Sequence, residues 1–162
     1  VIFKQIRVGQ GGREFGVFKF RTMVTNADAL LAELATHNET DGLLFKMRDD
    51  PRVTRVGRFL RKWSLDELPQ LANVIVGHMS LVGPRPPLPS EVARYDGDVA
   101  RRLLVKPGLT GWAQINYGYV SSVTETVIKL EYDLYYIKHR TLGMDVAIIL
   151  RTIGTVIRRT GR

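Results

Sequence analysis

Pro69 limits most tightly how the middle of this chain can fold. A proline inside a helix removes a backbone hydrogen bond and clashes with the preceding turn, whereas a proline in the first turn is tolerated. Apolar residues follow Pro69 at helical spacing: Leu71, Val74 and Ile75. We therefore predict a helix that begins near residues 66–68 and stops at Gly77, where a glycine can end it.

Two carboxylates, Asp66 and Glu67, fall at the predicted start of this helix. The positive field of a helix N-terminus favours their ionised forms. Adjacent helical residues point in different directions, so one carboxylate could attack a substrate while the other holds a metal ion. Acidic residues before a helix are also ordinary capping residues, so local chemistry alone leaves a purely structural role open.

The remaining pattern predicts a single domain over residues 1–162, of the α+β class and dominated by helix. Apolar runs on either side of residues 9–12 predict a small N-terminal β-hairpin. Asn26 can cap a helix that carries Leu30, Leu31 and Leu34. Further amphipathic helices are predicted over residues 54–63, 91–104, 123–139 and 142–159. Residues 40–51 are predicted to form a loop.

The charge balance indicates an anionic partner. Lys and Arg number 24 against 16 acidic residues, which gives a formal net charge of +8. Such an excess suits nucleic acid, an anionic bilayer or a phosphorylated substrate, and it does not choose among them. The chain has no cysteine, which excludes disulfides and thiolate chemistry.

The chain begins with Val1 and contains no apolar run long enough to span a bilayer. We therefore expect a fragment of a longer protein whose N-terminal membrane segment is absent here. The predicted last helix mixes apolar residues with arginines. It could bury itself in the fold or lie at a membrane surface with its basic end on lipid headgroups.

Arginines supply the candidates for phosphate binding. Arg55, Arg58 and Arg61 recur every three residues and share one helix face, most of which we expect to be solvated. Arg85 lies among three prolines in residues 83–87, a segment we call the proline turn. The rigid backbone would present its planar guanidinium with little entropy left to lose, which suits bidentate phosphate binding. A proline-rich surface turn without this role is equally open. The glycine-containing turn at 106–111 is a weaker signal.

Several motifs follow one another along the chain: FKFRTM at 18–23, DPRVTRVGRFLR at 50–61, SLDELPQ at 64–70, MSLVGPRP at 79–86, KPGLTGW at 106–112 and LEYDLYYI at 130–137. Together they resemble the bacterial sugar transferase family, the monotopic polyprenyl-phosphate phosphoglycosyl transferases. The likeness covers nearly the whole chain. Within the family, the chain resembles the type that initiates exopolysaccharide synthesis. It implies a membrane-surface-associated catalytic domain.

The resemblance implies a two-step transfer. Asp66 would attack the sugar-linked phosphate of a UDP-sugar, UMP would leave, and polyprenyl (undecaprenyl) phosphate would take the phospho-sugar from the carboxylate. Glu67 would hold Mg²⁺, which neutralises the diphosphate. Lys19, Arg61 and Arg85 would bind phosphate.

The same resemblance implies a location at the cytoplasmic face of the bacterial inner membrane and no nucleic-acid partner. A homo-oligomer is compatible with it, and the sugar is not determined. His78 replaces an Asp that is common before the MSLVG motif, and residues 116–119 depart from the usual Asn-Gly-Arg. Two other classes stay open from charge and pattern alone. They are a basic nucleic-acid-binding module and a catalytically silent membrane-surface scaffold.

Overall fold

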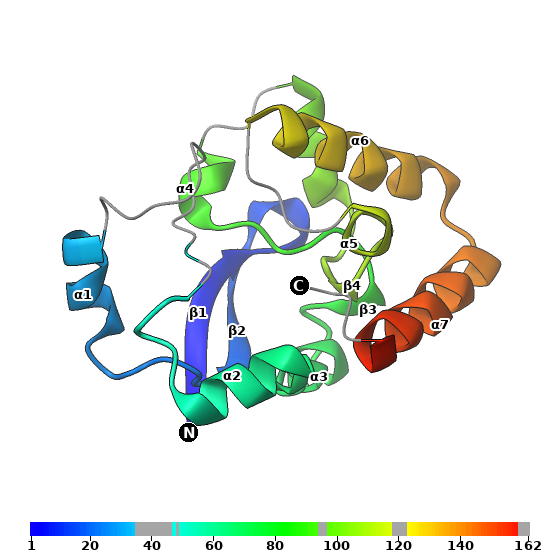
Figure 1. Ribbon diagram of the computed structural model, residues 1–162. Helices are drawn as coiled ribbons and strands as arrows, with labels where there is room; N and C mark the ends of the chain where they lie inside the picture. The colour runs from blue at the N-terminus through cyan, green and yellow to red at the C-terminus, as the bar shows by residue number, and fades with distance from the viewer. Residues whose placement is uncertain (35–46, 48, 94–96, 118–122, 159–162) are drawn as a thin grey trace.

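The computed structural model describes residues 1–34, 47, 49–93, 97–117 and 123–158 (Figure 1). The predicted α+β class with helix in the majority is confirmed. The predicted hairpin is also confirmed: β1 (Ile2–Val8) pairs antiparallel with β2 (Glu14–Phe20), with Ile2 opposite Phe20. A 3-10 turn, η1 (Gln10–Gly12), joins the two strands. Helix α1 (Ala27–Leu34) begins directly after Asn26, as expected.

Helix α2 (Arg55–Lys62) confirms the prediction for residues 54–63. Thr54 caps it, because its hydroxyl accepts a hydrogen bond from the Gly57 amide at 2.9 Å. A Cβ at Gly57 would overlap the carbonyl of Thr22, so only glycine lets the helix pack this closely. Helix α2 turns its Gly57 side toward the fold, and the apolar side chains of Val56 and Phe59 are exposed.

The middle segment differs from the prediction at its start. A 3-10 turn, η3 (Leu65–Glu67), comes first, and α3 (Gln70–Ile75) begins only after Pro69. The prediction of one helix starting at 66–68 is therefore wrong. Ser64 has a φ of 53° at the end of α2, and this left-handed residue turns the chain into η3. The predicted stop is confirmed, since Gly77 has a φ of 86°.

The predicted helix over residues 91–104 is also wrong. The described residues form a short helix, α4 (Pro89–Val92), and a separate 3-10 segment, η4 (Gly97–Leu104). Gly97 has a φ of 45°, a left-handed conformation that does not fit a continuous α-helix. Most of the predicted loop at 40–51 lies outside the described residues.

A second sheet joins the two halves of the chain. Its parallel strands are β3 (Ser80–Val82) and β4 (Gly108–Thr110). A short helix, α5 (Trp112–Asn116), follows, and then come the two long helices α6 (Val123–His139) and α7 (Leu142–Arg158), as predicted. Val82, Tyr136 and Ile148 form a buried core between this sheet and the long helices. Among the described residues, no helix is long and apolar enough to cross a membrane.

Candidate active site

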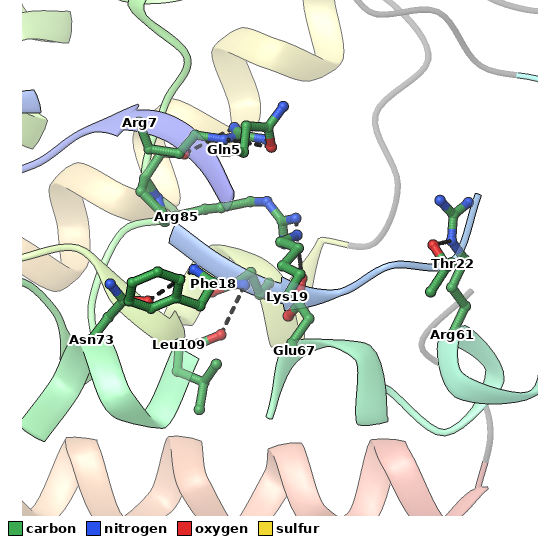
Figure 2. Close-up of polar contacts among 12 residues, drawn as sticks. Gln5, Arg7, Phe18, Lys19, Thr22, Arg61, Glu67, Asn73, Arg85 and Leu109 are labelled. Carbon is green, nitrogen blue, oxygen red and sulfur yellow. Dashed lines mark hydrogen bonds and ion pairs between the residues drawn. The ribbon is translucent and has the colours of Figure 1, made fainter. Parts of the chain in front are cut away.

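Three charged side chains from separate parts of the chain meet at one carboxylate oxygen (Figure 2). Lys19 of β2 places its Nζ 3.0 Å from Oε1 of Glu67 in η3. Arg85 of the proline turn places its Nη2 3.3 Å from the same oxygen. We call Lys19, Glu67 and Arg85 the Glu67 cluster. The structure therefore brings together three of the predicted site residues that are 48 and 18 positions apart in sequence.

The electrostatics of the cluster keep Glu67 ionised. Burial by itself would raise the pKa of Glu67, but the charges of Arg85 and Lys19 and their hydrogen bonds outweigh it and lower the pKa to about 2. Burial lowers the pKa of Lys19, and the charge of Arg85 lowers it further against the opposing effect of Glu67. Two cations facing one carboxylate leave a positive excess, which suits an anionic ligand.

Asp66, the neighbour of Glu67, has a different environment. Its side chain is buried, with the residue 7% exposed. Within the described part of the chain, its buried Oδ1 has no hydrogen-bond partner. A buried carboxylate oxygen without a partner costs stability, so it is a candidate for a functional group. Because η3 precedes α3 as a separate turn, the expected placement of both carboxylates in the first turn of a helix is corrected.

Arg61 lies apart from the Glu67 cluster. Its Nε donates a hydrogen bond to the hydroxyl of Thr22 at 2.9 Å. Figure 2 shows the Arg61–Thr22 pair well to one side of Lys19 and Glu67. On the same helix, Arg55 and Arg58 are exposed, in line with the expected solvated face. The structure therefore does not bring Arg61 together with the other predicted phosphate-binding residues.

The proline turn is not a surface turn. Pro84, Pro86 and Pro87 are buried, while Arg85 between them is half-buried and reaches Glu67. The turn packs against the start of β4, where the Gly108 amide donates to the Pro84 carbonyl at 2.9 Å. A Cβ at Gly108 would overlap the backbone of Gly83. The glycines of the 106–111 motif thus permit close approach of the chain to itself.

Sequence reasoning missed a buried residue that supports this site. Asn73 of α3 is fully buried, and its side chain donates to the Gly16 carbonyl at 2.8 Å and accepts from the Phe18 amide at 3.1 Å. These bonds attach α3 to β2, the strand that carries Lys19. The buried side-chain amide leaves no periodic signal, since only the pairing of distant segments gives it partners.

His78, His139 and Tyr136 make contacts within the fold. His78 lies against Phe15 with ring centroids 5.6 Å apart, and His139 lies against Tyr135 at 4.3 Å. Tyr136 is buried, and its hydroxyl lies 2.8 Å from the carboxylate of Asp145. Tyr136 therefore serves packing, in the core with Val82 and Ile148. His37 and residues 118–119 lie outside the described residues.

The carboxylates fit one mode of Mg²⁺ binding. No group of three or more His, Cys, Asp or Glu that could hold a metal is present in the described ranges. Mg²⁺ often takes only one or two carboxylates and completes its shell with substrate phosphates and water. Both cation contacts of Glu67 fall on Oε1. With the partnerless Oδ1 of Asp66, the site therefore offers carboxylate oxygens of the kind this mode requires.

Comparison with known proteins gives a consistent result. The sequence profile described as "Bacterial sugar transferase" matches residues 1–159. The chain is 43% identical to the UDP-N-acetylgalactosamine-undecaprenyl-phosphate N-acetylgalactosaminephosphotransferase of Aeromonas hydrophila, over 99% of this chain and 36% of that protein. It is 45% identical to the undecaprenyl-phosphate galactose phosphotransferase of Salmonella typhimurium, over 99% of this chain and 34% of that protein.

A shorter relative is covered more completely. The exopolysaccharide production protein ExoY of Sinorhizobium fredii is 41% identical over 99% of this chain and 72% of its own length. The chain thus spans about a third of the two larger relatives and most of the smaller one.

Proposed function

The chain belongs to the bacterial sugar transferase family, and on this premise we propose that it moves a sugar 1-phosphate from a UDP-sugar to polyprenyl (undecaprenyl) phosphate. The names of the Aeromonas and Salmonella relatives support this reaction class, and the ExoY name supports a place in exopolysaccharide synthesis. Those two relatives act on different sugars at nearly equal identity to this chain. Overall similarity therefore supports the class of donor but not a particular sugar.

The observation that carries the proposal is the partnerless, buried Oδ1 of Asp66 beside the Glu67 cluster. In the proposed first step, the Asp66 carboxylate attacks the sugar-linked phosphorus of the donor. The bond from that phosphorus to the bridging oxygen breaks, UMP leaves with the electron pair, and an aspartyl phospho-sugar forms. In the second step, a phosphate oxygen of the polyprenyl phosphate attacks the same phosphorus and releases Asp66.

Neighbouring groups have separate tasks in this scheme. Arg85 is the most accessible member of the Glu67 cluster, with its side chain 40% exposed, so it is placed to contact the diphosphate first. Lys19 contributes a second positive charge. Arg61 lies apart from this cluster, beside Thr22, and any phosphate contact it makes would be at that position. Glu67, with Asp66, would hold Mg²⁺, which when bound neutralises charge on the diphosphate.

Attack through Oδ1 of Asp66 also requires a local movement. Its Oδ1 is covered in this structure, so attack through this oxygen needs the carboxylate to rotate or its covering side chains to shift when the donor binds. The left-handed Ser64 two residues earlier shows that this segment already contains one residue in a disfavoured backbone conformation.

A lipid acceptor requires access to a bilayer, and exposed apolar residues on α2, α3 and α7 provide a suitable surface. These helices lie along the lower side of the molecule in Figure 1. Their exposed apolar residues, with two from the adjoining turns, are Val56, Phe59, Leu68, Leu71, Ile75, Val76, Leu142, Val146, Leu150, Ile153 and Ile157. Exposed Arg55 and Arg58 could contact anionic headgroups. These observations support the proposal that the domain acts at the cytoplasmic face of the inner membrane, where UDP-sugars occur.

The test is intact-protein mass spectrometry after incubation with Mg²⁺ and a panel of UDP-sugars, combined with an assay for UMP. Where the chain is part of a longer protein, that complete protein is used. We expect a phospho-sugar adduct that disappears when polyprenyl phosphate is added. Asp66→Asn should form no adduct, whereas Asp28→Asn, an exposed aspartate on α1, should behave like wild type.

Two negative results have different meanings. UMP release without an adduct would indicate a short-lived intermediate, and rapid quenching would then be needed to trap it. Neither adduct nor UMP with any donor would contradict the transferase proposal. In that case the exposed apolar surface would favour a catalytically silent membrane scaffold.

A further inference from the structure

Arg7 of β1 makes contacts that have no role in the reaction scheme proposed above. Its Nη1 donates a hydrogen bond to the carbonyl of Pro86 at 3.1 Å, across 79 positions of sequence. Its Nη2 and Nε donate to the side-chain oxygen of Gln5 at 2.8 and 3.2 Å. Figure 2 shows Gln5 and Arg7 next to the proline turn, from which Arg85 extends to Glu67. Gln5 thus orients the guanidinium, and the guanidinium holds Pro86.

The proline turn depends on contacts of this kind because prolines carry no N–H group. The backbone at Pro84, Pro86 and Pro87 can therefore be held only through carbonyl oxygens. Each of the three accepts a hydrogen bond: Pro84 from the Gly108 amide at 2.9 Å, Pro87 from the Val8 amide at 3.0 Å, and Pro86 from Arg7. Only Pro86, next to Arg85, takes its bond from a side chain.

The arrangement also places like charges near one another. Burial and the charge of Arg85 lower the pKa of Arg7 to about 10, so Arg7 is still a cation at neutral pH. The positive charges of Arg7 and Arg85 repel each other. A neutral side chain would pack here without this repulsion. The guanidinium, however, makes directed bonds to Gln5 and Pro86 that a neutral apolar side chain could not make.

We propose that Arg7 is a positioning residue: by holding the Pro86 carbonyl, it fixes the proline turn so that Arg85 stays directed at Glu67 and at the donor diphosphate. This inference rests on the proposed function. It assigns Arg7 no contact with the substrate, because its described bonds are to Gln5 and Pro86.

Arg7→Lys is the main test because it keeps the charge but cannot bond Gln5 and Pro86 in the same fork geometry. We expect UMP release to fall about 10- to 100-fold, as for a modest misplacement of a group that binds the reacting phosphate. Gln5→Leu should lower it in the same direction but less. Arg13→Lys, an exposed arginine of the same hairpin, is the matched control. Thermal unfolding of each variant shows whether the fold is retained.

A double-mutant cycle distinguishes positioning from an independent effect. If Arg7 acts through Arg85, Arg7→Lys should change UMP release less than about twofold in an Arg85→Gln background. Wild-type activity in the Arg7→Lys variant, or losses that simply multiply in the double variant, would overturn the inference while leaving the transferase proposal intact.

A second readout does not depend on activity. The Arg85 side-chain Nε–H signal in ¹⁵N NMR can be assigned by its loss in Arg85→Gln. Arg7→Lys should shift or broaden this signal, and Arg13→Lys should not. An unchanged Arg85 signal would overturn the inference even if the chain released no UMP, and that lack of UMP would count only against the proposed function.

Discussion

A charged surface and an apolar surface meet near η3, and they differ in whether their side chains have contacts within the chain. On one surface, Glu67 is bonded to Lys19 and Arg85 from two other segments. On the other, α2 and the end of α3 present large apolar side chains outward: Val56 is 68% exposed, Phe59 57%, Ile75 86% and Val76 66%. The charged surface is thus held by contacts within the chain, whereas the apolar side chains of the other surface are exposed.

This difference suits the proposed reaction, which combines a water-soluble donor with a lipid acceptor. Charged groups that bind phosphate need fixed positions, which ion pairs and buried hydrogen bonds provide. A membrane contact needs apolar area and nearby cations rather than fixed geometry. Because η3 lies between α2 and α3, the carboxylates are close in sequence to both surfaces.

The largest expected effect comes from removing the apolar surface. The combined variant Val56→Ser, Phe59→Ser, Ile75→Ser should weaken binding to anionic vesicles about 1,000-fold, since each fully buried apolar side chain contributes about 1.5 kcal/mol or more. Vesicle cosedimentation of the 162-residue chain measures this. Leu104→Ser, an exposed apolar residue of η4, is the control. Unchanged vesicle binding by the triple variant would show that this surface is not the membrane contact.

A smaller effect is expected from replacing Asn73, which attaches α3 to the strand that carries Lys19. Asn73→Ala removes two hydrogen bonds and leaves the Phe18 amide and the Gly16 carbonyl buried without their partner. We expect the free energy of unfolding to fall by about 3 kcal/mol, measured by urea denaturation. Asn116→Ala should cost far less, because Asn116 is exposed and bonds only one carbonyl of its own helix among the described residues. Equal losses would mean that Asn73 does not hold α3 against β2.

The smallest effect depends on pH. The pKa of Glu67 is about 2 in the fold against an ordinary value of 4.5, so Glu67 stabilises the fold above about pH 4.5 and loses this contribution as the pH falls toward 2. Glu67→Gln should therefore lower the free energy of unfolding by about 1–2 kcal/mol at pH 7. This difference should shrink below pH 4.5. Unfolding curves from pH 3 to 7 measure it, with exposed Glu14→Gln as the control. A pH-independent difference would contradict the ion-pair explanation.

Much of the local structure could be predicted because it depends on nearby residues. The hairpin follows from apolar runs around a glycine-rich turn, and α6 and α7 follow from long helical periodicity. Thr54 begins α2 as a capping residue should. The predictions failed where one backbone angle decided the outcome. Gly97 is left-handed within a segment whose apolar spacing suits a continuous helix, and the left-handed Ser64 leads into the 3-10 turn that delays the start of α3.

By itself, the sequence determined the α+β class, most helix positions, the excess of positive charge and the carboxylate pair at 66–67. These depend on composition, periodicity and capping, which act over a few residues. Only the tertiary structure decided that Lys19 and Arg85 share one oxygen of Glu67, that Arg7 holds Pro86, and that Val56 and Phe59 face outward. Such contacts join segments far apart in the chain, and no local pattern specifies which distant groups will pair when the elements pack.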